Sequence, residues 1–172
     1  TFAKRTLTKE QSEQLSSGAL RDAARLQNLV QDLLLAARLE DSWSPMPESI
    51  SLHTLVHDCT GTLKIRFPNA AIVNQVPANL PPLQADKSGL TSVILNLIEN
   101  ALKYDPSQSP VTVSAEHVKG RTIIKVADQG QGIPAHERKS VFEKFYRLGN
   151  EETRQAKGTG LGLYIVQQVI SA

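Results

Sequence analysis

The strongest pattern of apolar and polar positions lies between residues 90 and 104, LTSVILNLIENALKY. Apolar residues recur there at i, i+3, i+4, i+7, i+8 and i+11, which predicts one buried face of an α-helix. These residues are Leu90, Val93, Ile94, Leu97, Ile98 and Ala101. Asn96 and Asn100 lie off this stripe and are four residues apart, so they share a polar face, with Lys103 one turn further along. Asp86 is the predicted N-cap of the helix.

A longer helix is predicted over residues 8–39, which contain no proline and a heptad series of mostly apolar residues. The series steps alternately by four and three residues and comprises Leu15, Ala19, Asp22, Leu26, Leu29, Leu33 and Ala36. Such a helix would be about 45 Å long and cannot bury so broad a face alone, so we expect a partner helix in a bundle. Packing on its own domain ranks second, because the segment is long and residues 42–47, SWSPMP, break the chain after it.

After this break, helical and extended patterns alternate. The predicted strands are 50–52, 71–76 and 83–85, and a β-hairpin made of 111–116 and 122–127, with Lys119-Gly120 at its turn. The predicted helices are 52–66, the central helix, a short helix at 134–145 and a final helix at 161–171, with a polar mobile loop at 147–157. The predicted domains are one helix of an incomplete bundle (1–42), a linker (43–48) and a globular α+β domain (49–172).

Composition narrows the function classes. Of the 172 residues, 40% are hydrophobic and only 5% aromatic, which permits a core of aliphatic side chains. The 19 basic and 17 acidic residues give a net charge of +2, too balanced to indicate nucleic acid or an anionic membrane as a partner. The single cysteine, Cys59, excludes an intrachain disulfide and suits a reducing compartment. No apolar run reaches the roughly 18 residues of a membrane span, so we expect this stretch to be soluble. The location that we expect for it is cytoplasmic.

The polar face of the central helix is a candidate site for an anion with a hard metal ion. Magnesium takes oxygen ligands and usually keeps waters and substrate phosphates as its other ligands, which suits the amides of Asn96 and Asn100. Taken alone, this face would be interpreted as an ordinary solvated helix surface.

Two glycine-rich segments follow the central helix along the chain. Asp128 precedes Gly130 and Gly132 at a strand end, where backbone can approach a ligand and a carboxylate can accept a hydrogen bond from an adenine amine. The second segment, residues 158–162 (GTGLG), leads directly into a helix whose N-terminus suits phosphate. Arg147, Arg154 and Lys157 lie between them and could meet phosphate charge. Neither segment is a P-loop or a Rossmann fingerprint, and each alone is a weak signal, but their combination and order are a strong one.

Together these segments resemble the catalytic and ATP-binding domain of sensor histidine kinases, within the superfamily that includes gyrase, Hsp90 and MutL. Residues 96–104 (NLIENALKY) match the asparagine box, 128–133 (DQGQGI) the first glycine box, 142–147 (FEKFYR) the phenylalanine box and 158–163 (GTGLGL) the second glycine box. The resemblance covers residues 90–170. It implies a two-layer α/β sandwich, the Bergerat-type ATP-binding fold, preceded by a long helix that resembles the second helix of the dimerisation and histidine-phosphotransfer bundle.

The resemblance implies ATP and Mg²⁺ as cofactors. Asn100 would ligate Mg²⁺, and Asn96 and Lys103 would lie against phosphate. Phe142 and Phe145 would anchor a lid formed by residues 147–157, from which Arg147 would reach the γ-phosphate. The implied catalytic residues are Asn96 and Arg147. The implied nucleotide-binding residues are Asn96, Asn100, Lys103, Tyr104, Asp128, Gly130, Gly132, Ile133, Phe145, Arg147, Lys157, Gly158, Thr159, Gly160, Leu161 and Gly162.

One position separates kinases from hydrolases in this resemblance. The ATP-hydrolysing relatives carry a glutamate four residues before the magnesium-binding asparagine, as the base that activates water. Here that position is Asn96, an amide that cannot accept the proton. Glu99 points about 100° away from Asn100 around the helix. We therefore expect phosphoryl transfer to a separate nucleophile rather than efficient hydrolysis.

The resemblance also implies partners: a second copy, bound through the helical domain of the full protein, and a response-regulator receiver domain. Membrane contact is expected only through segments outside this chain, in a parent anchored in the bacterial inner membrane. No histidine lies in the family's phospho-acceptor setting, so the acceptor is expected upstream, and a final pair of strands is expected beyond Ala172. A serine kinase of the anti-sigma-factor type and a degenerate nucleotide-binding switch are the alternatives. The heptad helix disfavours the first, and the intact boxes disfavour the second.

Overall fold

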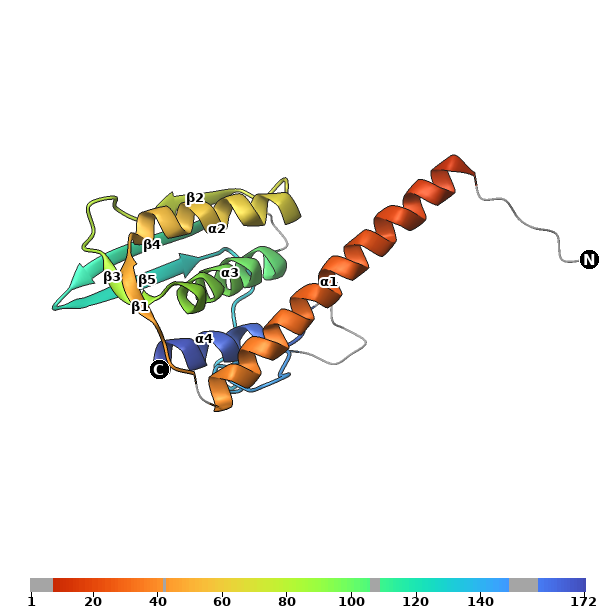
Figure 1. Cartoon of the computed structure of the whole chain (residues 1–172). Coiled ribbons are helices and arrows are strands. Elements are labelled where there is room, and N and C mark those ends of the chain that lie inside the picture. The colour runs from red at the N-terminus through yellow and green to blue at the C-terminus, as the bar shows by residue number, and fades with distance from the viewer. Residues whose placement is uncertain (1–7, 42, 106–108, 149–157) are drawn as a thin grey trace, which may run out of the picture.

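The chain forms an α+β body from which one long helix extends (Figure 1). The computed structural model describes residues 8–41, 43–105, 109–148 and 158–172. The elements, in chain order, are α1 (Lys9–Asp41), β1 (Pro47–Ile50), α2 (Leu52–Arg66), β2 (Ile72–Gln75), β3 (Leu83–Asp86), α3 (Lys87–Tyr104), β4 (Val111–Val118), β5 (Arg121–Ala127), the 3₁₀ turn η1 (Ser140–Phe142) and α4 (Gly162–Ser171). The predicted α/β sandwich preceded by a long helix is confirmed.

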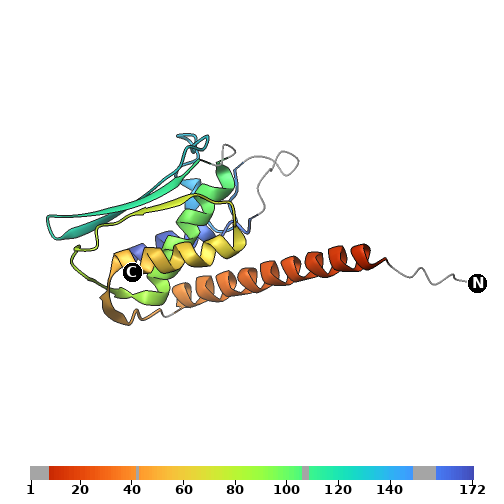
Figure 2. The same cartoon turned by 90° about the horizontal axis from the view of Figure 1, so that it is seen from above.

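The main sheet has the order β2-β4-β5, in which β2 is parallel and β5 antiparallel to β4. The hairpin of β4 and β5 turns at Lys119 and Gly120, whose φ angles of 52° and 74° are the left-handed values of a tight two-residue turn. A separate antiparallel pair joins β1 to β3. Helices α2 and α3 cover one face of the main sheet, and α1 lies beyond them (Figure 2).

The core of this body lies between the main sheet and helices α2 and α3. Its fully buried members are aliphatic, as the composition indicates, and Cys59 is packed among them. They include Val56, Cys59, Leu63, Ile94, Ile98, Val111 and Val113. No residue of α1 belongs to this cluster of described residues.

The central helix α3 begins where the sequence predicts. Asp86 is its N-cap: the backbone N–H of Gly89 donates to Asp86 Oδ1 at 2.8 Å, and the hydroxyl of Ser88 donates to the same oxygen at 2.6 Å. These hydrogen bonds, that of Ser88 first, lower the pKa of Asp86 from its ordinary value. The predicted apolar stripe is buried except at Leu97, which is half-buried and lines a cavity together with the polar face.

Helix α1 contacts the body through its C-terminal third. Ala36 is buried in a small cluster with Leu161, Tyr164 and Ile165 of the α4 region, against which Leu29, Leu35 and Leu39 also pack. Other apolar side chains of α1 are exposed, among them Leu15, Leu20, Leu26, Val30 and Leu34. The described helices include none that is both long and apolar enough to cross a membrane.

Two predicted elements differ from the structure. The predicted helix at 134–145 is wrong, because this segment is a series of turns that contains only η1. Val141 is its one buried residue, so no apolar face holds a longer helix in place. The strand predicted at 50–52 lies earlier, at Pro47–Ile50, and Leu52 instead opens α2 after the Ser51 N-cap. A proline is tolerated at Pro47 because it is the first residue of the strand.

Candidate nucleotide-binding site

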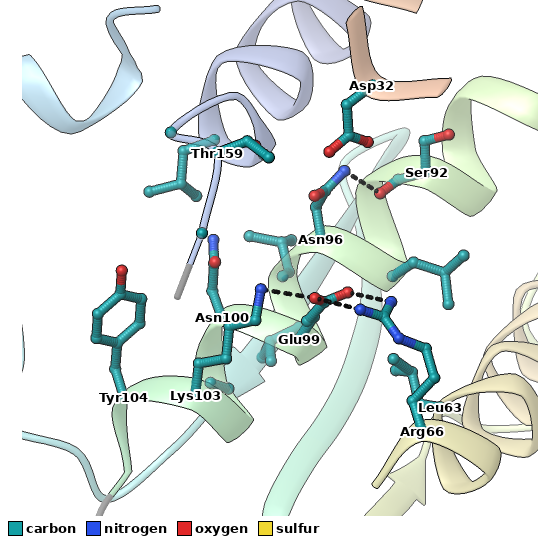
Figure 3. Close-up of a pocket in the computed structure, with 18 of the residues that line it drawn as sticks. Asp32, Leu63, Arg66, Ser92, Asn96, Glu99, Asn100, Lys103, Tyr104 and Thr159 are labelled. Atoms are coloured by element: carbon teal, nitrogen blue, oxygen red, sulfur yellow. Dashed lines mark hydrogen bonds and ion pairs between the residues drawn. The ribbon is translucent and has the colours of Figure 1, made fainter. Parts of the chain in front are cut away.

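A cavity of about 1120 Å³ opens beside α3, and most of the predicted nucleotide-binding residues line it. Asn96, Asn100, Lys103 and Tyr104 come from α3 itself (Figure 3). The other predicted residues that line it follow β5 or lie near the start of α4: Asp128, Gly130, Gly132, Ile133, Arg147, Gly158, Thr159, Gly160 and Gly162. The structure thus brings together all four boxes, which are far apart in the sequence.

Three predicted residues do not line the cavity or are not described. Leu161 is fully buried in the cluster with α1, and the side chain of Phe145 is 61% exposed. Neither is among the side chains around the cavity. Lys157 lies outside the described residues, as do Arg154 and nearly all of the lid expected at 147–157.

Asn96 is held against the second glycine box. Its amide nitrogen donates to the carbonyl of Ser92 at 3.0 Å, one turn earlier in α3. A Cβ added at Gly162 would stand 2.6 Å from Asn96 Oδ1, closer than side chains approach one another. A larger residue at 162 would therefore displace the Asn96 side chain or the start of α4.

The first glycine box is packed on the C-terminal end of α3. The backbone N–H of Gly130 donates to Asp128 Oδ1 at 2.8 Å, and a Cβ at Gly130 would meet the carbonyl oxygen of Tyr104 at 2.7 Å. The side chain of Asp128 is exposed at the edge of the cavity, where it is able to accept a hydrogen bond from a ligand.

The phenylalanine box meets the second glycine box through backbone contacts. The N–H of Phe145 donates to the carbonyl of Gly160 at 3.0 Å, and a Cβ at Gly160 would stand 2.7 Å from the carbonyl carbon of Phe145. Both residues have left-handed φ angles, 62° at Phe145 and 76° at Gly160. A side chain at residue 160 would not fit so close a contact, which explains the glycine there. The contact holds together the two segments that flank residues 149–157.

Helix α4 points its N-terminus into the cavity. Gly158, Thr159, Gly160 and Gly162 line the cavity where the helix begins, and the hydroxyl of Thr159 accepts from the N–H of Leu161 at 3.2 Å. The first N–H groups of a helix lack carbonyl partners within it and carry the positive end of the helix dipole. This end of the cavity therefore suits phosphate groups.

Four charged side chains from three helices line the cavity: Asp32, Arg66, Glu99 and Lys103. The carboxylate of Glu99 accepts hydrogen bonds from both terminal nitrogens of Arg66, at 2.8 and 3.0 Å (Figure 3). It also forms an ion pair with the amine of Lys103, at 2.6 Å. Burial raises the pKa of Glu99, but Lys103 and Arg66 outweigh it, so that the pKa lies below its ordinary value. The pKa of Asp32, which reaches in from α1, is raised by burial and then by the charge of Glu99.

Of these four residues, the sequence analysis named only Lys103 as a site residue and missed the other three. The pair of Glu99 and Lys103 has the i, i+4 spacing that favours an ion pair on a helix, so it was open to prediction. Arg66 and Asp32 come from α2 and α1, and no local pattern indicates that they line the same cavity.

The donor set of the cavity fits Mg²⁺ held mainly by a nucleotide. Among the residues that the structure describes, no group of three or more His, Cys, Asp or Glu side chains could hold a metal ion by itself. Asn100 supplies one amide oxygen from the lining of the cavity. One protein oxygen suffices for Mg²⁺ whose remaining ligands are phosphates and water.

Comparisons with known proteins agree with this geometry. The family described as "Histidine kinase-, DNA gyrase B-, and HSP90-like ATPase" matches residues 85–172. The adaptive-response sensory kinase SasA of Synechocystis sp. is 30% identical over 171 residues, 95% of this chain and 44% of that protein. The chain spans less than half the length of the curated relatives it matches.

Two solved structures resemble the chain. The mycobacterial sensor histidine kinase MprB superposes with a TM-score of 0.60 at 30% identity, over 74% of this chain and 78% of that chain. Full-length ShkA in complex with AMPPNP superposes with a TM-score of 0.76 at 28% identity, over 96% of this chain and 35% of that chain. The second match includes both α1 and the body that carries the cavity.

Proposed function

Since the chain belongs to the family of histidine kinase-, DNA gyrase B- and HSP90-like ATPases, we propose that it is the ATP-binding kinase core of a two-component sensor histidine kinase. In this proposal the γ-phosphoryl group of ATP passes to a histidine outside the chain and from there to an aspartate of a response regulator. The similarity to SasA and MprB, which are named as sensory and sensor kinases, favours the kinase branch of the family.

The lining of the cavity offers partners for both parts of ATP. The carboxylate of Asp128 would accept the adenine amine, and Tyr104 and Ile133 of the same lining would flank the adenine. The N-terminus of α4 and the polar face of α3, which also line the cavity, would face the phosphates. The likeness to ShkA, whose structure holds the ATP analogue AMPPNP, supports this assignment.

The observation that carries the proposal is the environment of Asn96. Its amide nitrogen is engaged by Ser92, and its oxygen lies against Gly162 at the N-terminus of α4. A hydrolase would need a base at this position to take a proton from water, and an amide has no basic site at neutral pH. The cavity is therefore suited to hold ATP for a nucleophile that another domain supplies.

Catalysis of phosphoryl transfer depends mainly on positioning the reactants and on neutralising charge. No side chain of this chain therefore needs to form a covalent bond to the phosphoryl group. Bound Mg²⁺ would supply charge stabilisation at the phosphates, held by Asn100. Lys103 and Arg147 line the cavity and would add positive charge near the phosphates. Asn96 would orient the phosphates by hydrogen bonding.

The partners belong to the whole protein. Helix α1 leaves most of its apolar residues exposed, which supports a second copy bound through a helical bundle. The proposal also includes a receiver domain as the final acceptor, a cytoplasmic location for this part of the protein, and no role in nucleic-acid binding.

The deciding experiment incubates the chain, extended upstream through the partner helix of α1, with γ-labelled ATP and Mg²⁺. We expect the label to be on a phosphohistidine, so that it is lost in acid and retained in alkali. Acid-stable label would contradict the proposal and indicate a serine kinase, and bound ATP without label would indicate a nucleotide switch.

The metal assignment has its own test in calorimetry. Asn100→Ala is expected to remove the part of the ATP affinity that depends on Mg²⁺, because it deletes the proposed protein ligand of the metal. An unchanged ATP affinity in the presence of Mg²⁺ would contradict this role for Asn100.

A further inference from the structure

Glu99 is shared between two cations from different helices. Arg66, the last residue of α2, binds both carboxylate oxygens through its two terminal nitrogens, at 2.8 and 3.0 Å. The amine of Lys103 lies 2.6 Å from one of these oxygens, Oε1. The side chain of Glu99 is 16% exposed, so its charge needs a partner in the folded protein.

The proposed function gives Lys103 a second task that conflicts with this ion pair. To meet phosphate, the Lys103 amine must turn away from Glu99. A carboxylate that is mostly out of water and has lost its only cation resists such a change, because desolvation disfavours an unpaired charge. Asp32, which faces the same cluster from α1, adds a second negative charge and makes the loss of a cation more costly.

We propose that Arg66 is a positioning residue for ATP binding: by neutralising Glu99 from α2, it frees Lys103 to bind phosphate. This inference rests on the proposed ATP site and extends it to a residue outside the four boxes. Arg66 is not a catalytic residue, because its effect on phosphate passes through Glu99 and Lys103.

The geometry divides the two cations by how firmly each is held. The guanidinium of Arg66 is a planar fork that matches both oxygens of the carboxylate, and it also lies 5.7 Å from the centre of the Phe67 ring. Lys103 presents one point charge on a flexible four-carbon stem and holds one oxygen. Lys103 is therefore the cation that can leave Glu99, and Arg66 is the one that remains.

The test measures ATP and adenosine binding by calorimetry in the presence of Mg²⁺. Arg66→Gln is expected to raise the Kd for ATP about three- to tenfold, because Lys103 is then retained by Glu99, and to leave the Kd for adenosine unchanged. Lys125→Gln is the control for the loss of a cation, since it breaks an exposed ion pair with Glu116 on the β4–β5 hairpin, outside the lining of the cavity. It is expected to change neither Kd.

Charge compensation distinguishes this role from a structural one. Glu99→Gln removes the competitor for Lys103, so adding it to Arg66→Gln should restore ATP affinity, and by itself it should leave ATP binding equal or tighter. Arg66→Lys should restore part of the affinity. If Arg66→Gln weakens ATP and adenosine alike, or if Glu99→Gln fails to rescue it, the inference is wrong.

The same data separate this inference from the function on which it rests. If the unmodified chain binds neither ATP nor adenosine, the ATP site itself is wrong. If the unmodified chain binds ATP and Arg66→Gln binds it equally well, the site stands and only the role of Arg66 is lost.

Discussion

Gly162 lies so close to Asn96 that a methyl group at residue 162 would stand 2.6 Å from Asn96 Oδ1. Gly162→Ala must therefore displace either Asn96 or the start of α4, although alanine is normally the better helix former. We expect calorimetry to show a loss of ATP affinity of about tenfold or more, and thermal unfolding to show a lower Tm.

Gly61 provides the matched control for this substitution. It lies inside α2, and a Cβ there would meet no atom within 4 Å. Gly61→Ala is expected to stabilise the fold by about 0.5–1 kcal/mol without changing ATP affinity. If Gly162→Ala behaves like Gly61→Ala, the close contact between α4 and Asn96 does not constrain the site.

Asp32 gives a prediction about pH. Burial, and then the charge of Glu99, raise its pKa above the ordinary 3.8, while Lys103 and Arg66 act in the opposite direction. A carboxyl with a raised pKa in the folded state favours folding below pH 3.8, and this contribution is lost as the pH rises through the folded pKa. Asp32→Asn removes that loss, so we expect a Tm about 1–3 °C higher at pH 7.

The gain from Asp32→Asn should shrink as the pH is lowered from 7 towards 4, because Asp32 then becomes neutral in the original chain as well. Asp58→Asn, at an exposed position of α2, is the control for the same chemical change made outside the cavity. A difference in Tm that stays constant with pH would show that burial of the Asp32 charge is not the cause.

At this scale the sequence predicts what is local. Asn96, Asn100 and Lys103 could be placed on one face because helical spacing alone determines their relation. Arg66 and Glu99 are 33 residues apart on different helices, so their contact depends on how α2 packs against α3. No spacing rule encodes that packing.

At the scale of elements, Glu40 joins α1 to the two segments that flank residues 149–157. It forms an ion pair with Lys144 and accepts a hydrogen bond of 2.8 Å from the hydroxyl of Tyr164, and Lys144 lies 5.1 Å from the centre of the Tyr164 ring. The hydrogen bonds from Lys144 and Tyr164 lower the pKa of Glu40. The residue after Lys144 is Phe145, whose backbone holds Gly160.

Glu40→Gln is expected to loosen α1 without unfolding the body, because an exposed ion pair contributes little to global stability but this one connects three segments. Hydrogen exchange should become faster in the C-terminal third of α1 and at Phe145, and the Tm should change by less than about 2 °C. Glu116→Gln on the hairpin is the control. Unchanged exchange in α1 would show that Ala36 and the leucines hold this helix by themselves.

The predicted elements succeed where an apolar face repeats and fail where it does not. Residues 90–104 carry a complete stripe, and α3 forms there with its predicted cap. Residues 134–145 contain helix-forming side chains but bury only Val141, and the segment forms turns. Helix propensity alone does not stabilise a helix this short, because short helices in proteins depend on the packing of an apolar face.

At the scale of the molecule, the main core lies within the body, and α1 joins the body through a second, smaller cluster. The larger core extends from Ile50 to Ala115, and none of its described members comes from α1. The smaller cluster joins Ala36 of α1 to Leu161, Tyr164 and Ile165. The predicted heptad seam covers residues 15–36, and among its described side chains the C-terminal members Leu29 and Ala36 pack against the body, whereas Leu15 and Leu26 are exposed. The sequence could indicate that α1 needs a partner surface, but not that α4 would cover only one end of it.

This separation predicts how the molecule responds to the loss of α1. Without residues 1–42, the remaining chain is expected to unfold in one cooperative transition, because its main core is intact. The Tm should fall by a few degrees as Leu161 and Ile165 lose Ala36 and its neighbours. ATP affinity should be equal or tighter, since Asp32 no longer adds a negative charge beside the phosphates. Thermal unfolding and calorimetry on the shortened chain measure both effects, and a non-cooperative transition or lost ATP binding would show that α1 is an integral part of the nucleotide-binding fold.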